Sequence, residues 1–247
     1  MYSSRDRLII VDADGTLIDA FSAIGAAFAR HGMDLGDLDR FQKRRNLFKY
    51  LGGIKEFPRN LARQLGRQGR KAVLDSLTEV YREEARLYPG MAELLRDMLA
   101  EPALRVGLIT RNVTREPGIT MARLFERHSV DIEALDFFHH IPLRQEKAPF
   151  FRAVRERLDI NPALAYACGD EHKDYLAALA AGMHPFIAAY GFESHARLSR
   201  KFGIPEELLA ATPEALCGRV RHALDLENET GETSAVPGRP DSDRLPA

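Results

Sequence analysis

Short apolar runs that alternate with helical patterns are the feature that most constrains the fold of this chain. Five runs are candidates for buried strands: residues 8–11, 106–110, 137–141, 164–168 and 185–190. Most of them are separated by helical patterns, at residues 91–100, 117–128, 149–158 and 175–181. Strands that alternate with helices favour a parallel sheet covered on both faces. We therefore expect an α/β protein with a Rossmann-like parallel sheet. Thr212 and Pro213 predict one more helix after the last strand.

Residues 20–88 interrupt this alternation, because helical patterns occur there without a convincing strand. The segments 40–53 and 71–88 are amphipathic at helical spacing. Asp19 is placed to cap the first helix of the insertion, which follows it directly in the chain. The end of the chain is polar and rich in Pro, Gly, Ser and Asp, which is typical of a flexible tail. We expect a discontinuous core of residues 1–18 and 89–226, an all-helical insertion of residues 19–88, and a flexible tail of residues 227–247.

The insertion is unusually basic. Residues 30–71 contain 12 Lys and Arg against 4 Asp and Glu. A solvated helix surface would explain this, and so would a basic lid that attracts an anionic substrate. Lys55 follows Gly52 and Gly53, and it is either a surface lysine beside a turn or a substrate-binding residue that reaches the site from the lid.

Composition narrows the class of protein. The chain has 247 residues, of which 45% are hydrophobic, so a large core is possible, and its net charge of -1 does not suggest a nucleic-acid partner. Cys168 and Cys217 form neither a disulfide framework nor a zinc motif. The apolar run after Arg7 is too short for a signal peptide, and His184 and Pro185 break the longest apolar stretch. We expect a cytoplasmic monomer or homodimer with no membrane partner.

Polar side chains follow several of the predicted strands. Asp12 and Asp14 come directly after the first, where two carboxylates would repel each other without a cation between them. The other polar residues near strand ends are Thr110, Arg111 and Asn112 after the second strand, Asp170, Glu171 and Asp174 after the fourth, and Lys147 at the start of the helix before the fourth. Ligands of such sheets bind beyond the carboxyl ends of the strands. A few carboxylate oxygens with room for water and phosphate suit Mg²⁺.

Other interpretations of the aspartate pair explain less. An EF-hand loop needs glycine at its sixth position, but Gly15 is the fourth residue counted from Asp12. A plain turn at the strand end would account for the pair by itself, but not for the other polar residues. A D-x-D motif of the sugar-nucleotide transferase type stays open, although it leaves Thr110 and Lys147 without a role.

The sequence resembles the haloacid dehalogenase (HAD) superfamily. "DADGTLID", the "LIT" that ends at Thr110, Lys147 and "GDEHKD" are similar to its four ordered motifs. The insertion resembles a helical C1 cap of the phosphoglycolate-phosphatase-like type, and the resemblance covers roughly residues 7–225. Three positions depart from the common pattern: Ala13 replaces an aromatic residue, Ala148 a proline, and Arg111 an asparagine or small residue. None of these departures removes a catalytic group, but the substrate of a particular member of the superfamily does not carry over to this chain.

The resemblance implies a reaction at phosphorus. Asp12 would be the nucleophile and form an aspartyl-phosphate, while Asp14 would act as general acid and then as general base. Because side chains alternate along an extended chain, Asp12 and Asp14 point the same way. Lys147 would orient Asp12 and bind the phosphoryl group, and Thr110 would donate its hydroxyl to a phosphate oxygen, joined by backbone N–H groups around Arg111.

The implied cofactor is Mg²⁺. It would be held by Asp12, by the backbone carbonyl of Asp14 and by Asp170, with Asp174 acting through water. The expected activity is that of a phosphoric monoester hydrolase, a Mg²⁺-dependent phosphatase acting on a small phosphorylated metabolite. The alternatives are a phosphoryl-transfer mutase on the same scaffold, a dehalogenase, and a non-catalytic protein that binds anions through the basic insertion.

Overall fold

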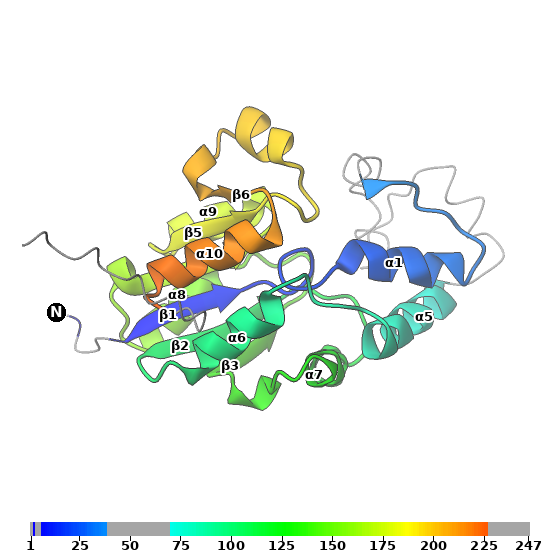
Figure 1. The fold of residues 1–247 in the computed structure, drawn as a ribbon, viewed down its shortest axis with the longest axis horizontal. Helices are drawn as coiled ribbons and strands as arrows, with labels where there is room; N and C mark the ends of the chain where they lie inside the picture. The colour runs from blue at the N-terminus through cyan, green and yellow to red at the C-terminus, as the bar shows by residue number, and fades with distance from the viewer. Residues whose placement is uncertain (1, 3–5, 39–69, 227–247) are drawn as a thin grey trace, which may run out of the picture.

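The computed structural model describes residues 2, 6–38 and 70–226 (Figure 1). Its centre is a six-stranded sheet with the order β3-β2-β1-β4-β5-β6, in which every neighbouring pair is parallel. The strands are β1 (Arg7–Val11), β2 (Leu104–Thr110), β3 (Phe137–His140), β4 (Ala165–Gly169), β5 (His184–Ala188) and β6 (Leu209–Ala210). The predicted α/β fold with a Rossmann-like parallel sheet is confirmed.

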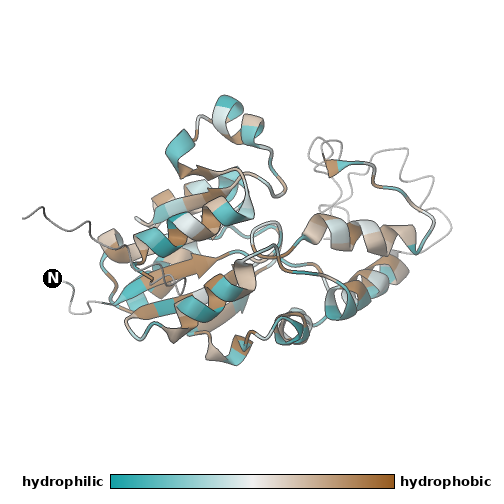
Figure 2. Cartoon of the chain, in the orientation of Figure 1, coloured by the Kyte–Doolittle hydropathy of each residue, from teal (hydrophilic) through white to brown (hydrophobic). Residues whose placement is uncertain are grey.

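Helices cover both faces of the sheet. On one face lie α6 (Met91–Ala100), α7 (Pro117–Arg127) and α10 (Pro213–Ala223), and on the other lie α8 (Ala148–Arg157) and α9 (His172–Ala180). Two further helices, α1 (Ala20–Ala29) and α5 (Arg70–Glu83), belong to the insertion. The central strand shows why. Ile9 and Val11 of β1 belong to the cluster formed with α6, α7 and α10, whereas Leu8 and Ile10 belong to the cluster formed with α8 and α9. A strand buried on both sides is apolar throughout, and the sheet is accordingly the hydrophobic middle layer (Figure 2).

All five strands expected from the apolar runs are present, as is the helix that Thr212 caps and Pro213 begins. The sequence reading missed β6, because two residues are too short a run to show a pattern. The observed strand ends also lie in register. Val11 of β1 is paired with Leu108 of β2 and with Cys168 of β4. The residues that follow these three strands therefore reach the same edge of the sheet.

The described part of the insertion is helical. Helices α1 and α5 contact each other and lie beyond the carboxyl end of β1 (Figure 1). Asp19 caps α1 as expected, since its side chain accepts a hydrogen bond from the Ser22 backbone N–H at 3.0 Å. The predicted helical segment 40–53 and the tail 227–247 lie outside the described residues. None of the helices in the described ranges combines the length and apolar character needed to cross a bilayer.

Candidate active site

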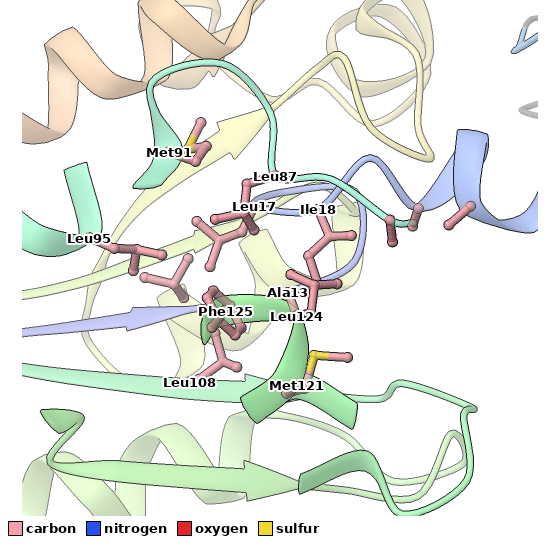
Figure 3. Close-up of a cluster of buried hydrophobic side chains, with 14 of the residues drawn as sticks. Ala13, Leu17, Ile18, Leu87, Met91, Leu95, Leu108, Met121, Leu124 and Phe125 are labelled. Atoms are coloured by element: carbon pink, nitrogen blue, oxygen red, sulfur yellow. The ribbon is translucent and has the colours of Figure 1, made fainter. Parts of the chain in front are cut away.

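The loop after β1 presents its two aspartates on one side and anchors itself with apolar residues on the other. Ala13, between the aspartates, is fully buried, and Leu17 and Ile18 are buried in the same cluster (Figure 3). Their neighbours there include Leu87 and Leu124, from the return segment and from α7 (Figure 3). A small side chain at position 13 fits this packed site, and burying it leaves the flanking carboxylates pointing out of the core.

Lys147 joins two of the carboxylates. Its Nζ lies 2.5 Å from Asp12 Oδ2 and 2.7 Å from Asp174 Oδ1, and its side chain is only 2% exposed. Burial would lower the pKa of Lys147, but the negative charges of Asp12 and Asp174 raise it above its ordinary value. The lysine therefore holds a fixed positive charge beside Asp12, and the carboxylate of Asp12 cannot turn without breaking the ion pair.

Asp12, Asp170 and Asp174 form a cluster that fits a metal ion. One carboxylate oxygen from each residue lies within 4.8 Å of the others. Among the described residues, Asp170 Oδ1 is buried without a hydrogen-bond donor, while Asp170 Oδ2 accepts the Phe192 N–H at 2.6 Å. Both oxygens of Asp174 are engaged, one by Lys147 and the other by the Glu171 N–H at 3.0 Å. Asp170 thus offers a free oxygen for direct ligation, whereas Asp174 is better placed to act through water.

The pKa values of the cluster are also consistent with a cation-binding site. Burial raises the pKa of Asp12 to about 7, although Lys147 acts to lower it. Burial, followed by the charges of Glu171, Asp174 and Asp12, raises the pKa of Asp170 well above its usual range. Burial would also raise the pKa of Asp174, but Lys147 and Arg111 bring it below its ordinary value. An all-oxygen site of this kind suits Mg²⁺, whose charge would favour the ionised form of Asp12 and Asp170.

Gly15 allows the loop to approach Asp170. Its backbone φ of +79° lies in the left-handed region that favours glycine. A Cβ atom at this position would also come within 2.2 Å of Asp170 Oδ2. Both constraints exclude a larger residue here without a shift of the loop or of Asp170.

Thr110 and Arg111 stand at the end of β2. Thr110 is fully buried, and its Oγ1 accepts the Asn112 N–H at 3.2 Å. The Arg111 guanidinium forms an ion pair with Glu171 at 3.0 Å, in which the two side chains are 11% and 23% exposed. Burial would lower the pKa of Arg111, but nearby carboxylates, Asp174 foremost, raise it. The pair therefore spans from the end of β2 to the residue after Asp170.

The structure adds one functional candidate that the sequence analysis missed, Tyr81, and it gives contacts to two residues, Asn112 and Glu171, that were noted there only as polar residues near strand ends. Tyr81 Oη donates a hydrogen bond to Asp14 Oδ1 at 2.7 Å, and Asn112 Nδ2 lies 3.1 Å and 2.9 Å from the two oxygens of the same carboxylate. Glu171 is the partner of Arg111. The position of Asn112 and Glu171 next to strand ends was the signal that found them, whereas Tyr81 looks like an ordinary core residue of an amphipathic helix. The proposed substrate ligand Lys55 lies outside the described residues.

A comparison with known protein families agrees with this geometry. Residues 7–182 match the family model described as haloacid dehalogenase-like hydrolase. The chain belongs to this family. The match covers most of the sheet and every candidate residue in the described ranges, so the resemblance drawn from the four motifs is confirmed. It also establishes the protein as a hydrolase-family member. No curated protein matches the chain.

Solved structures of this hydrolase fold agree. CbbY from Rhodobacter sphaeroides in complex with phosphate matches with a TM-score of 0.56 and 21% identity, over 84% of this chain and 95% of that one. A haloacid dehalogenase-like hydrolase from Streptococcus pneumoniae matches with a TM-score of 0.56 and 18% identity, over 87% of this chain and 98% of that one. A predicted phosphatase from Clostridium acetobutylicum matches with a TM-score of 0.55 and 16% identity, over 89% of this chain and 100% of that one. At these identities the likeness concerns the fold.

Proposed function

We propose that this HAD-family protein is a Mg²⁺-dependent phosphatase that hydrolyses a small phosphorylated metabolite through an aspartyl-phosphate. The observation that carries the proposal is the buried group of Asp12, Asp170 and Asp174 with Lys147 between Asp12 and Asp174. A nucleophilic carboxylate, a fixed cation and a free metal-binding oxygen are the parts that phosphoryl transfer requires. The fold neighbour CbbY was solved with phosphate, which agrees with this chemistry.

The first step forms the bond between Asp12 and phosphorus. An oxygen of Asp12 attacks the phosphoryl group, and the bond from phosphorus to the substrate oxygen breaks. Asp14 gives its proton to the leaving oxygen. Lys147 offsets charge on the phosphoryl oxygens and keeps Asp12 in place. Thr110 and the backbone N–H groups near Arg111 bind the remaining phosphoryl oxygens.

The second step returns the enzyme to its starting state. Asp14, now a carboxylate, takes a proton from water as that water attacks phosphorus. The bond between Asp12 and phosphorus breaks, and phosphate leaves. Asp12, Asp170 and the Asp14 backbone carbonyl would hold Mg²⁺, with Asp174 acting through water. When bound, Mg²⁺ supplies positive charge that makes the attack of a carboxylate on a phosphate dianion possible.

The decisive experiment measures phosphate release from p-nitrophenyl phosphate, with Mg²⁺ and after treatment with EDTA. Turnover is expected only with the metal, and full turnover in metal-free buffer would reject the proposal. A panel of phosphorylated metabolites then identifies the substrate. Release of inorganic phosphate distinguishes a phosphatase from a mutase, which would return the phosphoryl group to another position of the substrate.

Metal binding can be measured without turnover. The pKa of about 7 for Asp12 means that Mg²⁺ must displace a proton from much of the metal-free protein at neutral pH. Titration calorimetry should therefore show Mg²⁺ affinity rising from pH 6 to pH 8, with proton release that decreases over the same range. Asp170→Asn should abolish this binding, because it replaces the carboxylate whose Oδ1 is buried without a hydrogen-bond donor among the described residues.

A further inference from the structure

The carboxylate of Asp14 is contacted by a helix of the insertion. Tyr81, on α5, is 2% exposed and packs within the main hydrophobic cluster, yet its hydroxyl donates to Asp14 Oδ1 at 2.7 Å. A buried tyrosine hydroxyl needs a hydrogen-bond partner, and here that partner is the proposed proton donor of the reaction.

Asn112 holds the same carboxylate through its amide. Its Nδ2 donates to Asp14 Oδ1 at 3.1 Å and to Oδ2 at 2.9 Å. Asn112 is itself fixed, because its Oδ1 accepts the Thr114 N–H at 2.8 Å and its backbone carbonyl lies 2.7 Å from Nε2 of His140. Asp14 therefore has donors from two separate elements, and their directions define the plane of its carboxyl group.

The two donors are also held relative to each other. The loop that carries Asn112 continues to Arg115, whose N–H donates to Thr78 Oγ1 of α5 at 2.9 Å. One turn further along α5, Arg82 donates to Thr120 of α7 at 3.1 Å and pairs with Glu116 at 3.0 Å. Helix α5 is thus docked on the loop after β2 and on α7, and Tyr81 faces Asp14 as a consequence.

We propose that Tyr81 is a positioning residue that fixes the Asp14 carboxyl for proton transfer to the leaving oxygen. This inference rests on the proposed function. A proton donor must lie within hydrogen-bond reach of the oxygen it protonates, and a misplacement of about 1 Å can cost roughly 10²-fold in rate. Without Tyr81, the Asn112 amide is the donor to this carboxyl group that remains among the described residues, and Asp14 gains freedom to rotate.

The test compares Tyr81→Phe with Tyr190→Phe. Both changes remove one buried hydroxyl, and Tyr190 donates to the Thr16 carbonyl of the same loop at 2.9 Å without contacting Asp14. Proton donation matters most for poor leaving groups. Tyr81→Phe should lower kcat about tenfold with an alkyl phosphate and less than about threefold with p-nitrophenyl phosphate. Tyr190→Phe should change both rates by a similar factor.

A substitution of Asn112 provides a second variant. Asn112→Ala removes the amide donor to Asp14 without placing a charge beside it, so it should show the same selective loss with the alkyl phosphate. Equal losses with the two substrates in both the Tyr81 and Asn112 variants would assign these residues a purely structural role and overturn the inference.

Crystal structures of the wild type and of Tyr81→Phe separate this inference from the proposed function. The Asp14 carboxyl is expected in one orientation in the wild type and in more than one in the variant. If the wild type lacked phosphatase activity but Asp14 became disordered in Tyr81→Phe, the proposed function would fail and the positioning role would stand. An unchanged Asp14 in the variant would overturn the positioning role, whatever the activity.

Discussion

Asp12 and Asp14 are two residues apart, yet their side chains have different surroundings. Asp12 is paired with the buried ammonium of Lys147. Within the described residues, the side chain of Asp14 accepts hydrogen bonds from two neutral donors, Tyr81 and Asn112. Burial raises the pKa of Asp14, while these two hydrogen bonds act to lower it. A raised pKa favours the protonated form that the proposed acid needs. Burial raises the pKa of Asp12 as well, to about 7, but the ammonium of Lys147 acts to lower it and so favours the ionised form that the proposed nucleophile needs.

Substitution of each aspartate should separate the two roles. Asp12→Asn should abolish turnover of every substrate, because no aspartyl-phosphate can form. Asp14→Asn should lower the first step by roughly 10²–10⁴-fold with an alkyl phosphate, and far less with p-nitrophenyl phosphate, whose leaving group departs as an anion. Loss of the base should also slow the second step. Rapid-quench kinetics and mass spectrometry should then show a phosphoryl group accumulating on Asp12.

The contrary result for the aspartate pair is specific. If Asp12→Asn and Asp14→Asn lost the first step equally with both substrates, the two carboxylates would not have separate roles.

The ion pair between Arg111 and Glu171 leads to a second prediction at this scale. Glu171 competes with an incoming phosphoryl group for the Arg111 guanidinium, so Glu171→Gln should lower the inhibition constant of inorganic phosphate. Arg111→Gln should raise this constant roughly tenfold, which corresponds to about 1.4 kcal/mol. The double variant should resemble Arg111→Gln, because without the guanidinium Glu171 and phosphate no longer compete for it.

The matched control for this pair is Glu79→Gln, which removes an exposed partner of Arg30. Exposed ion pairs contribute little, and phosphate inhibition should stay unchanged. Weaker phosphate binding in Glu171→Gln would show that Glu171 supports the anion site instead of competing with it.

Among the elements, α1 begins where the chain leaves the active-site loop. The Asp19 side chain accepts the Ser22 N–H at 3.0 Å and the Ser22 hydroxyl at 2.6 Å. Asp19→Ala should reduce the free energy of unfolding by about 1 kcal/mol, because an N–H group at the helix start loses its partner. Urea denaturation measures this loss. Asp19→Asn should retain most of the stability, since asparagine caps helices equally well.

The same variants test whether Asp19 takes part in the reaction. Its side-chain bonds go to Ser22, so the kcat of Asp19→Ala should stay within about twofold of the wild type under conditions where the variant is folded. A large loss of kcat in a folded Asp19→Ala protein would contradict the capping role assigned to this residue.

For the molecule as a whole, charge is unevenly distributed along the chain. The net charge is -1, although residues 30–71 contain 12 basic and 4 acidic side chains. If this segment attracts an anionic substrate, kcat/KM should fall as salt rises, because charges are screened beyond about 8 Å at physiological ionic strength. Arg44→Glu combined with Arg45→Glu should raise KM more than it lowers kcat.

A matched pair of reversals outside the insertion controls for net charge. Arg157→Glu with Arg200→Glu changes the charge by the same amount at two exposed positions, and KM should change less. An unchanged KM in the Arg44 and Arg45 variant would identify these arginines as part of a solvated surface.

The sequence by itself determined the fold class and the place of the chemistry. Its apolar runs specified five parallel strands, and the carboxyl ends of such strands meet at one edge. The sequence alone therefore predicted that the residues next to those ends lie close together. Asp12 and Asp170 follow β1 and β4, and Lys147 and Asp174 are brought to the same edge by the helices on either side of β4.

Only the tertiary structure decided which other residues reach these carboxylates. Tyr81 contacts Asp14 across 67 residues of sequence, Asn112 across 98, and Arg111 contacts Glu171 across 60. The periodicity of an amphipathic helix predicts that a tyrosine on its apolar face is buried in the core. It does not predict which residue the tyrosine hydroxyl contacts. The docking of α5 on α7 and on the loop after β2 sets that position, and no local pattern in the sequence encodes it.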